Sequence, residues 1–204
     1  PARQAWLGEA TKRWQDGTVV GFQVGRLGED AGPLGSSGNG AFDLGGGADT
    51  TFTGLFAATP LSPSTTAFAS ASYGMTSGQG LGGGLLRDFS DVGSRAYGVG
   101  LATTGAVQDG DRLGLAVSRP LKVVAGSASL DVPVGRSMDG TVLTESQRVA
   151  LSPSGTETDF EVTWSMPLEG PQSLVVGGMM MLEPGNVADA DIGYGAGLKY
   201  RLRW

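Results

Sequence analysis

The last thirteen residues of the chain alternate between two kinds of side chain. Every second residue is apolar or aromatic: Ile192, Tyr194, Ala196, Leu198, Tyr200, Leu202 and Trp204. The residues between them are glycines and cations: Gly193, Gly195, Gly197, Lys199, Arg201 and Arg203. Because successive side chains of a β-strand point to opposite faces, this stretch predicts a strand with one apolar and one polar face. A closing strand of this kind, ending on an aromatic residue, is typical of an outer-membrane β-barrel.

Similar alternation recurs from Thr18 onward, interrupted by turn signals rich in Gly and Pro. These signals are Asp16-Gly17, Pro60-Leu61-Ser62-Pro63, Asp139-Gly140 and Glu183-Pro184-Gly185. The chain has 36 glycines and 10 prolines, and most of the glycines lie among Val, Leu, Phe and Thr, which favours strands and turns over disorder. We expect about ten to twelve antiparallel strands, the higher number requiring strands within the Gly-rich stretches 32–47 and 76–84.

The N-terminal segment has a different pattern. Trp6, Ala10 and Trp14 recur at a spacing of four, with charged residues between them. This spacing predicts a short helix within residues 1–15, followed by a β-barrel domain over residues 16–204. The helix would either pack its tryptophans against the end of the domain or plug or cap the lumen of the barrel.

Composition excludes several classes of function. The net charge of -6 argues against nucleic-acid binding, and no apolar run approaches the roughly 18 residues of a transmembrane helix. The chain has no Cys and no His, so Ser-His-Asp and Cys-His catalysis are impossible. The two residue types that zinc prefers as ligands are also absent. We therefore expect no enzyme activity, no cofactor and no metal, although carboxylates in loops, such as Asp88 and Asp91, leave acid-base chemistry open.

Charged residues share the predicted inner side of several strands. These candidate lumen-facing residues are Lys199, Arg201, Arg203, Asp159, Glu161 and Arg112. If the sheet closes, they project into a wet or semi-buried interior, where opposite charges need to pair. The alternative is a solvated strand face with ordinary ion pairs worth under about 1 kcal/mol each.

The run from Arg112 to Trp204 resembles the C-terminal segment of alphaproteobacterial subtilisin-like serine peptidases of autotransporter type. The phrases that carry the resemblance are Leu115-Ala116-Val117-Ser118-Arg119-Pro120-Leu121, Gly126-Ser127-Ala128-Ser129-Leu130, Pro133-Val134-Gly135, Leu151-Ser152-Pro153-Ser154-Gly155, Glu183-Pro184-Gly185 and Tyr200-Arg201-Leu202-Arg203-Trp204. The resemblance implies a membrane-embedded barrel that follows a secreted protease passenger, in which any protease activity would reside. It also implies that Tyr200, Leu202 and Trp204 form a signal read by the outer-membrane assembly machinery.

Together these observations predict an all-β, antiparallel, closed transmembrane barrel in the bacterial outer membrane that anchors and translocates or displays an N-terminal passenger. Its partners would be outer-membrane lipid, the assembly machinery and the passenger segment. Aromatic residues make up only 7% of the chain, so any aromatic girdles would be sparse, drawn from Trp204, Tyr200, Trp164, Phe160, Tyr97, Tyr73, Phe68 and Phe52. The alternative is a soluble β-sandwich that acts as a structural or interaction module in an extracellular assembly, with Ile192, Leu198 and Leu202 buried against a second sheet.

Overall fold

The computed structural model of the chain describes residues 3–30, 40, 47–78, 84–168, 170 and 172–202. These residues form strands and one short 3-10 helix, η3 (Pro184–Asn186). The strands are β1 (Arg3–Arg13), β2 (Val19–Glu29), β3 (Ala48–Pro60), β4 (Thr65–Thr76), β5 (Leu86–Arg87), β6 (Val92–Thr104), β7 (Arg112–Ala125), β8 (Ser127–Arg136), β9 (Val142–Ala150), β10 (Thr158–Pro167), β11 (Gln172–Leu182) and β12 (Gly193–Leu202). The predicted all-β, antiparallel class is therefore confirmed.

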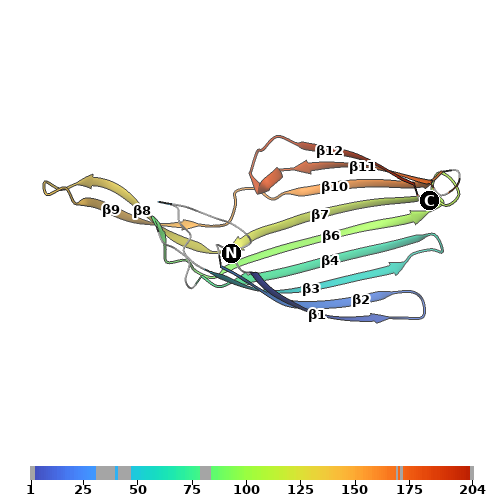
Figure 1. The fold of residues 1–204 in the computed structure, drawn as a ribbon, viewed down its shortest axis with the longest axis horizontal. Coiled ribbons are helices and arrows are strands. Elements are labelled where there is room, and N and C mark those ends of the chain that lie inside the picture. Colours follow the sequence, from blue (N-terminus) through green and yellow to red (C-terminus); the bar gives the residue numbers. More distant parts are fainter. Residues whose placement is uncertain are drawn as a thin grey trace.

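Nine of the strands form one sheet in the order β1-β2-β3-β4-β6-β7-β10-β11-β12 (Figure 1). All its ladders are antiparallel. Its strands are 10 to 14 residues long. Strands in globular proteins are commonly about five or six residues long, whereas a tilted strand needs about 9 to 11 to cross a bilayer. Among the described residues, no helix is long and apolar enough to cross a membrane.

The N-terminal segment is a strand, and the predicted helix within residues 1–15 is wrong. β1 pairs along its whole length with β2, from Arg3 opposite Glu29 to Arg13 opposite Val19. A spacing of four residues suits one face of a helix, but as an even number it also suits one face of a strand. Trp6, Ala10 and Trp14 thus fitted both periods. β1 therefore belongs to the sheet, and the predicted boundary between residues 15 and 16 does not separate a helix from a barrel.

A second, smaller sheet consists of β5, β8 and β9. The β8–β9 hairpin extends away from the main sheet (Figure 1), and Asp139-Gly140 forms its turn, with Gly140 at φ 91°. The alternation after Pro120 predicts a near-continuous strand, but Gly126, at φ 135°, separates β7 from β8. A residue with a side chain rarely adopts such a φ, so this glycine lets the chain leave the main sheet.

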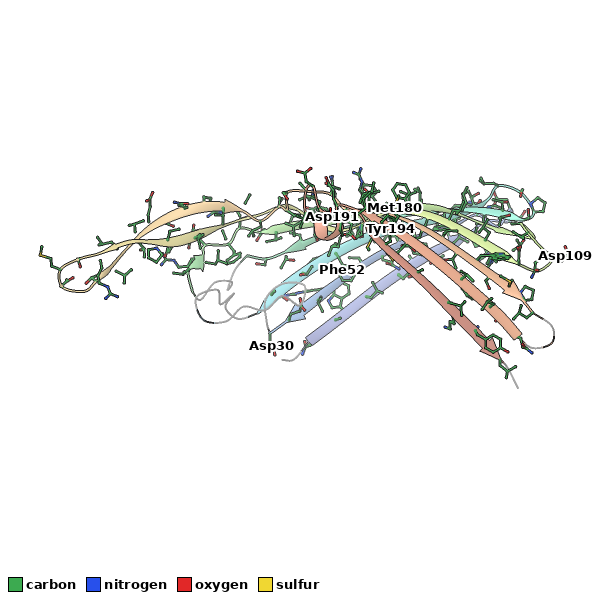
Figure 2. The ribbon with its side chains drawn as sticks, turned by 90° about the horizontal axis from the view of Figure 1, so that it is seen from above. Asp30, Phe52, Asp109, Met180, Asp191 and Tyr194 are labelled. Carbon is green, nitrogen blue, oxygen red and sulfur yellow. The ribbon has the colours of Figure 1, made fainter. Side chains whose placement is uncertain are left out.

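β1 and β12 are the two edges of the main sheet, and no ladder joins them in the described ranges. The sheet is nevertheless arched, with both edges on the same side of its central strands (Figure 2). The predicted closure into a barrel is thus not observed, and the structure is an open, curved sheet of nine strands.

The connections at the two ends of the sheet differ in length. At one end they are short, spanning residues 14–18, 61–64, 105–111 and 168–171, and we call this the short-turn end. At the opposite, long-loop end they span 30–47, 77–91, 126–157 and 183–192, and the β8–β9 hairpin projects there. β1 begins at the long-loop end and β12 finishes at the short-turn end (Figure 1).

Little of the described chain is buried. Its buried apolar residues are Ala48, Val92 and Ala128, all small or medium-sized. Leu198 is 71% exposed, and Ile192 and Leu202 are also exposed. A β-sandwich would bury such side chains between two facing sheets about 10 Å apart. The arrangement of the main sheet is therefore that of a single layer.

Candidate functional site

The main sheet has two chemically distinct faces, which the pairing register assigns residue by residue. Residues directly opposite one another in antiparallel strands point to the same side. One row crosses all nine strands through Lys12, Val20, Ala57, Ala69, Val99, Val117, Phe160, Met180 and Tyr194. The neighbouring row crosses through Arg13, Val19, Ala58, Phe68, Gly100, Ala116, Glu161, Met179 and Gly195. We call the faces that contain these rows the apolar face and the glycine face.

The two faces lie on different sides of the arch. Met180 and Tyr194, on the apolar face, lie on its outer side, whereas Phe52, on the glycine face, lies on its inner side (Figure 2). Along β6, the side chains of the apolar face are exposed at Tyr97, Val99 and Leu101, while the glycine-face residues from Ala96 to Ala102 are half-buried. Most of the large apolar side chains thus point outward, whereas glycines and small residues, with a few larger ones such as Phe52, line the concave side.

The apolar face carries aromatic residues in two lines. Toward the long-loop end lie Trp6, Tyr73, Tyr97 and Tyr194, and toward the short-turn end lie Trp14, Trp164 and Tyr200. Between the lines the face consists mainly of Val, Leu, Ala, Phe, Met and Thr. Of the expected girdle residues, Phe52 and Phe68 instead belong to the glycine face. Phe160 lies on the apolar face outside the two lines, whereas Tyr73, Tyr97, Trp164 and Tyr200 belong to them, together with Trp6, Trp14 and Tyr194.

Most charged residues of the apolar face lie at the aromatic line nearer the long-loop end or between that line and the long-loop end. Arg26 pairs with Asp49 at 3.0 Å, and Arg119 donates a hydrogen bond to the Tyr97 hydroxyl at 2.8 Å. Arg95 and Lys122 lie in the same region, opposite one another. Within the described strands, the one charged residue between the aromatic lines is Lys12, whose Nζ lies 4.9 Å from the centroid of the Trp14 ring. The middle of this face is therefore a nearly charge-free apolar band.

On the glycine face, three phenylalanines cover glycines of the neighbouring strands. Phe56 is opposite Gly21, Phe52 opposite Gly25 and Phe68 opposite Gly100. A Cβ added at Gly21 would lie 2.0 Å from the Phe56 ring, and one at Gly25 would lie 2.4 Å from the Phe52 ring. Aromatic rings over strand glycines pin the register and recover the packing that the glycine lacks.

The predicted lumen charges that the structure describes all lie on the glycine face, but the expected ion pairs do not form among them. Asp159 stands in a row with Gly193 of β12, whereas Lys199 stands in a row with Ser165 and Arg112. Six residues along a strand separate Asp159 from Ser165, about 20 Å at about 3.3 Å per residue. The cations Arg112, Lys199 and Arg201 therefore gather near the short-turn end, away from Asp159 and Glu161. Arg203 lies outside the described residues.

Asp159 is the most enclosed of these charges. It is only 7% exposed, and its Oδ1 has no hydrogen-bond partner among the described residues. A buried carboxylate normally has a partner because desolvation is costly. One carboxylate oxygen on the concave face is therefore without a hydrogen-bond partner among the described residues, and Glu161 is the next residue on the same face of the strand.

Tyr200 and Leu202, two members of the predicted assembly signal, are exposed on the apolar face. The Tyr200 hydroxyl donates a hydrogen bond of 2.7 Å to Oε1 of Gln172, which stands opposite Leu202. The third member, Trp204, lies outside the described residues. The two described members share the outward-facing position that the alternation predicts.

A turn at the short-turn end is anchored by a buried aspartate that the sequence pattern did not predict. Asp111 is fully buried and accepts hydrogen bonds from the Trp164 indole at 2.8 Å and from the backbone amides of Ala106, Val107 and Gln108. Burial on its own would raise the pKa of Asp111, but these donors outweigh it and hold the pKa below its usual value. An Asp at the end of a Gly-containing turn indicates a side chain that can accept hydrogen bonds from the turn. Its partner Trp164 is distant in sequence, so the sequence alone does not reveal it.

The comparisons do not assign a family. No protein-family model matches the chain, and neither the curated proteins nor the solved structures contain a match. Among the described residues, no group of three or more acidic side chains is placed to hold a metal ion. The geometry of the two faces is therefore the basis for a functional proposal.

Proposed function

We propose that this chain is part of an outer-membrane β-barrel that anchors an N-terminal passenger and translocates or displays it. The observation that carries the proposal is the apolar band between two aromatic lines, on strands of 10 to 14 residues. Such a band, flanked by aromatic side chains, matches the surface that a barrel presents to lipid. In water the same surface would be a large exposed apolar patch, which soluble monomers rarely carry.

The difference between the two ends of the sheet supports an orientation. Bacterial outer-membrane barrels have short periplasmic turns and longer extracellular loops. On this basis the short-turn end faces the periplasm, and the long-loop end with the β8–β9 hairpin faces outward. The last strand then finishes in the periplasm, where Tyr200, Leu202 and Trp204 would be accessible to the assembly machinery.

The role that we propose is physical rather than catalytic. The apolar face partitions into lipid, and closure of the sheet satisfies every backbone hydrogen bond. The glycine face, with its small side chains and its separated anions and cations, would line the lumen through which the passenger or its linker passes. The likeness of residues 112–204 to autotransporter-type peptidases supports the passenger part of the proposal.

The test is the behaviour of the protein in membranes of cells that make it. We expect it to remain in the membrane after washing with alkaline carbonate, and to migrate faster on a gel when unboiled than when boiled. Protease added to intact cells should cleave within the long loops and leave the short turns intact. If the protein washes off and shows no mobility shift, the soluble module replaces the membrane proposal.

A further inference from the structure

The two edge strands of the main sheet run in the same direction. Nine strands follow one another with antiparallel pairing, so the first and the ninth must point the same way. Figure 1 shows β1 and β12 both running from the long-loop end to the short-turn end. If β1 paired directly with β12, the joint would be parallel in a sheet whose observed ladders are all antiparallel.

A second copy of the chain does not solve this problem within one membrane orientation. A copy rotated about the barrel axis would place its β1 beside β12, which is again a parallel joint. Two β12 strands would pair in antiparallel fashion only if one copy were inverted, with its long loops on the opposite side of the membrane. Antiparallel closure in a single orientation therefore requires an odd number of additional strands.

We propose that the β1 and β12 edges bind further polypeptide as β-strands, odd in number and antiparallel to both edges, and that the segment leading into β1 supplies them. This inference rests on the proposed function. β1 begins at the long-loop end, so a strand ahead of it would be joined by one more turn there and would begin at the short-turn end. Added strands of this kind would satisfy the edge backbone groups, as in β-augmentation.

The side chains on the two edge strands, β1 and β12, indicate which residues the added strands should carry. At the short-turn end, the glycine face carries exposed cations on both edges, Arg13 on β1 and Lys199 and Arg201 on β12. The ion pairs found within the described ranges, Arg26–Asp49 and Arg87–Asp131, include none of these three. An added strand should therefore place an acidic side chain on its inner face near its start. Its outer face should continue the apolar band beside Leu198 and Ala10, and small residues should fill the remaining inner positions.

The experiment uses the protein as cells make it, with a photo-crosslinking amino acid introduced at one position at a time. The positions are Leu198 on β12 and Ala10 on β1, both on the apolar face at an edge. Leu115, on the same face of the interior strand β7, is the matched control because β7 is already paired with a strand on each side. After irradiation of intact membranes, the adducts are identified by peptide mass spectrometry.

We expect both edge positions to give adducts with residues that precede Pro1 in the same polypeptide, and Leu115 to give none. Adducts between Leu198 and residues 3–13 would show direct parallel closure and overturn the inference. Adducts with β12 of a second copy or with another protein, or no peptide adduct at either edge, would also overturn it. Carbonate resistance and the mobility shift are scored in the same membranes, so the inference can fail while the proposed function stands.

Discussion

Gly21 and Phe56 form the closest of the contacts between an aromatic ring and a glycine on the concave face. Gly21 is buried beneath the ring, and the three atoms nearest to an added Cβ would all belong to that ring, the closest at 2.0 Å. Substituting alanine would therefore displace the Phe56 side chain rather than the backbone. Overpacking of this kind commonly costs about 1–3 kcal/mol.

We therefore expect Gly21→Ala to lower the temperature at which half of the detergent-solubilised protein unfolds. This midpoint is measured as the loss of the fast-migrating gel form with rising temperature. Gly197→Ala is the matched control, because Gly197 lies on the same face and an added Cβ would meet nothing within 4 Å. The double variant Gly21→Ala/Phe56→Leu should recover part of the decrease in the unfolding midpoint. Equal effects of the two alanine substitutions would contradict the packing role of the Phe56 ring.

Asp111 makes the short-turn end sensitive to acid. Its folded-state pKa lies below its usual value, so its hydrogen bonds contribute stability fully above the unfolded-state pKa of about 3.9 and lose it as the pH falls through the lower folded value. We expect Asp111→Asn to be less stable than the parent at pH 7, with the difference shrinking by pH 3. Unfolding midpoints in denaturant at the two pH values measure this.

Asp109 provides the control for Asp111, because it is an exposed acid in the same turn with no hydrogen bond of its own within the described residues. Asp109→Asn should leave the midpoints almost unchanged at both pH values. If instead it reproduced the effect of Asp111→Asn, general charge repulsion rather than the Trp164–Asp111 network would explain the acid sensitivity.

At the scale of single elements, the β8–β9 hairpin is structurally separate from the main sheet. Its strands pair with each other and with β5, and Arg87 of β5 forms an ion pair with Asp131 of β8. Its tip is exposed, with Val134, Met138 and Leu143 in contact with little else. None of the ladders of the nine-stranded sheet includes a residue of β8 or β9.

Replacing residues 129–148 with a short Gly-Ser turn should therefore leave membrane retention and the boiled-against-unboiled mobility difference intact. The substitution removes the hairpin but keeps the path from β7 to β10. Carbonate extraction and gel mobility of the variant, compared with the parent, are the measurements. A variant that no longer inserts would mean that the hairpin takes part in assembly.

The strands show which parts of the fold could be predicted. Alternation identified β12 to within a few residues and assigned both of its faces, because a two-residue period reports directly on side-chain direction. It failed at β1, where a four-residue spacing satisfied helix and strand alike. It also missed the departure of β8 from the sheet, since the pattern on both sides of Gly126 continues while the backbone turns.

The candidate site was predictable in part for the same reason. The shared face of Asp159, Glu161, Arg112, Lys199 and Arg201 follows from parity within each strand. The distances between these residues do not follow from parity, because the stagger between β10 and β12 depends on the register of two ladders. The expected ion pairs assumed that residues with the same parity also share a row. That register depends on turn geometry and on packed pairs such as Phe56 and Gly21, which are separated in sequence.

At the scale of the whole molecule, the two faces of the main sheet should differ in whether they tolerate a charged side chain. Leu115 and Ala116 are neighbours on the central strand β7, and the register places them on the apolar face and the glycine face respectively. Leu115 is exposed, and its row partners are Leu101 and Val162, within the nearly charge-free band. If the band contacts lipid, a charge at position 115 must enter hydrocarbon, whereas a charge at position 116 enters the wet concave side.

Leu115→Arg should therefore destabilise the membrane-inserted protein by about 2–4 kcal/mol, the cost of arginine on the lipid face of a barrel near the midplane. Ala116→Arg, one residue away, should cost much less, because a wet interior can solvate the guanidinium beside Glu161, which stands opposite Ala116. The comparison is made by reversible denaturant unfolding from lipid vesicles. A soluble module would have water on both faces of this single-layer sheet and would tolerate both substitutions, so equally small effects would contradict the membrane assignment.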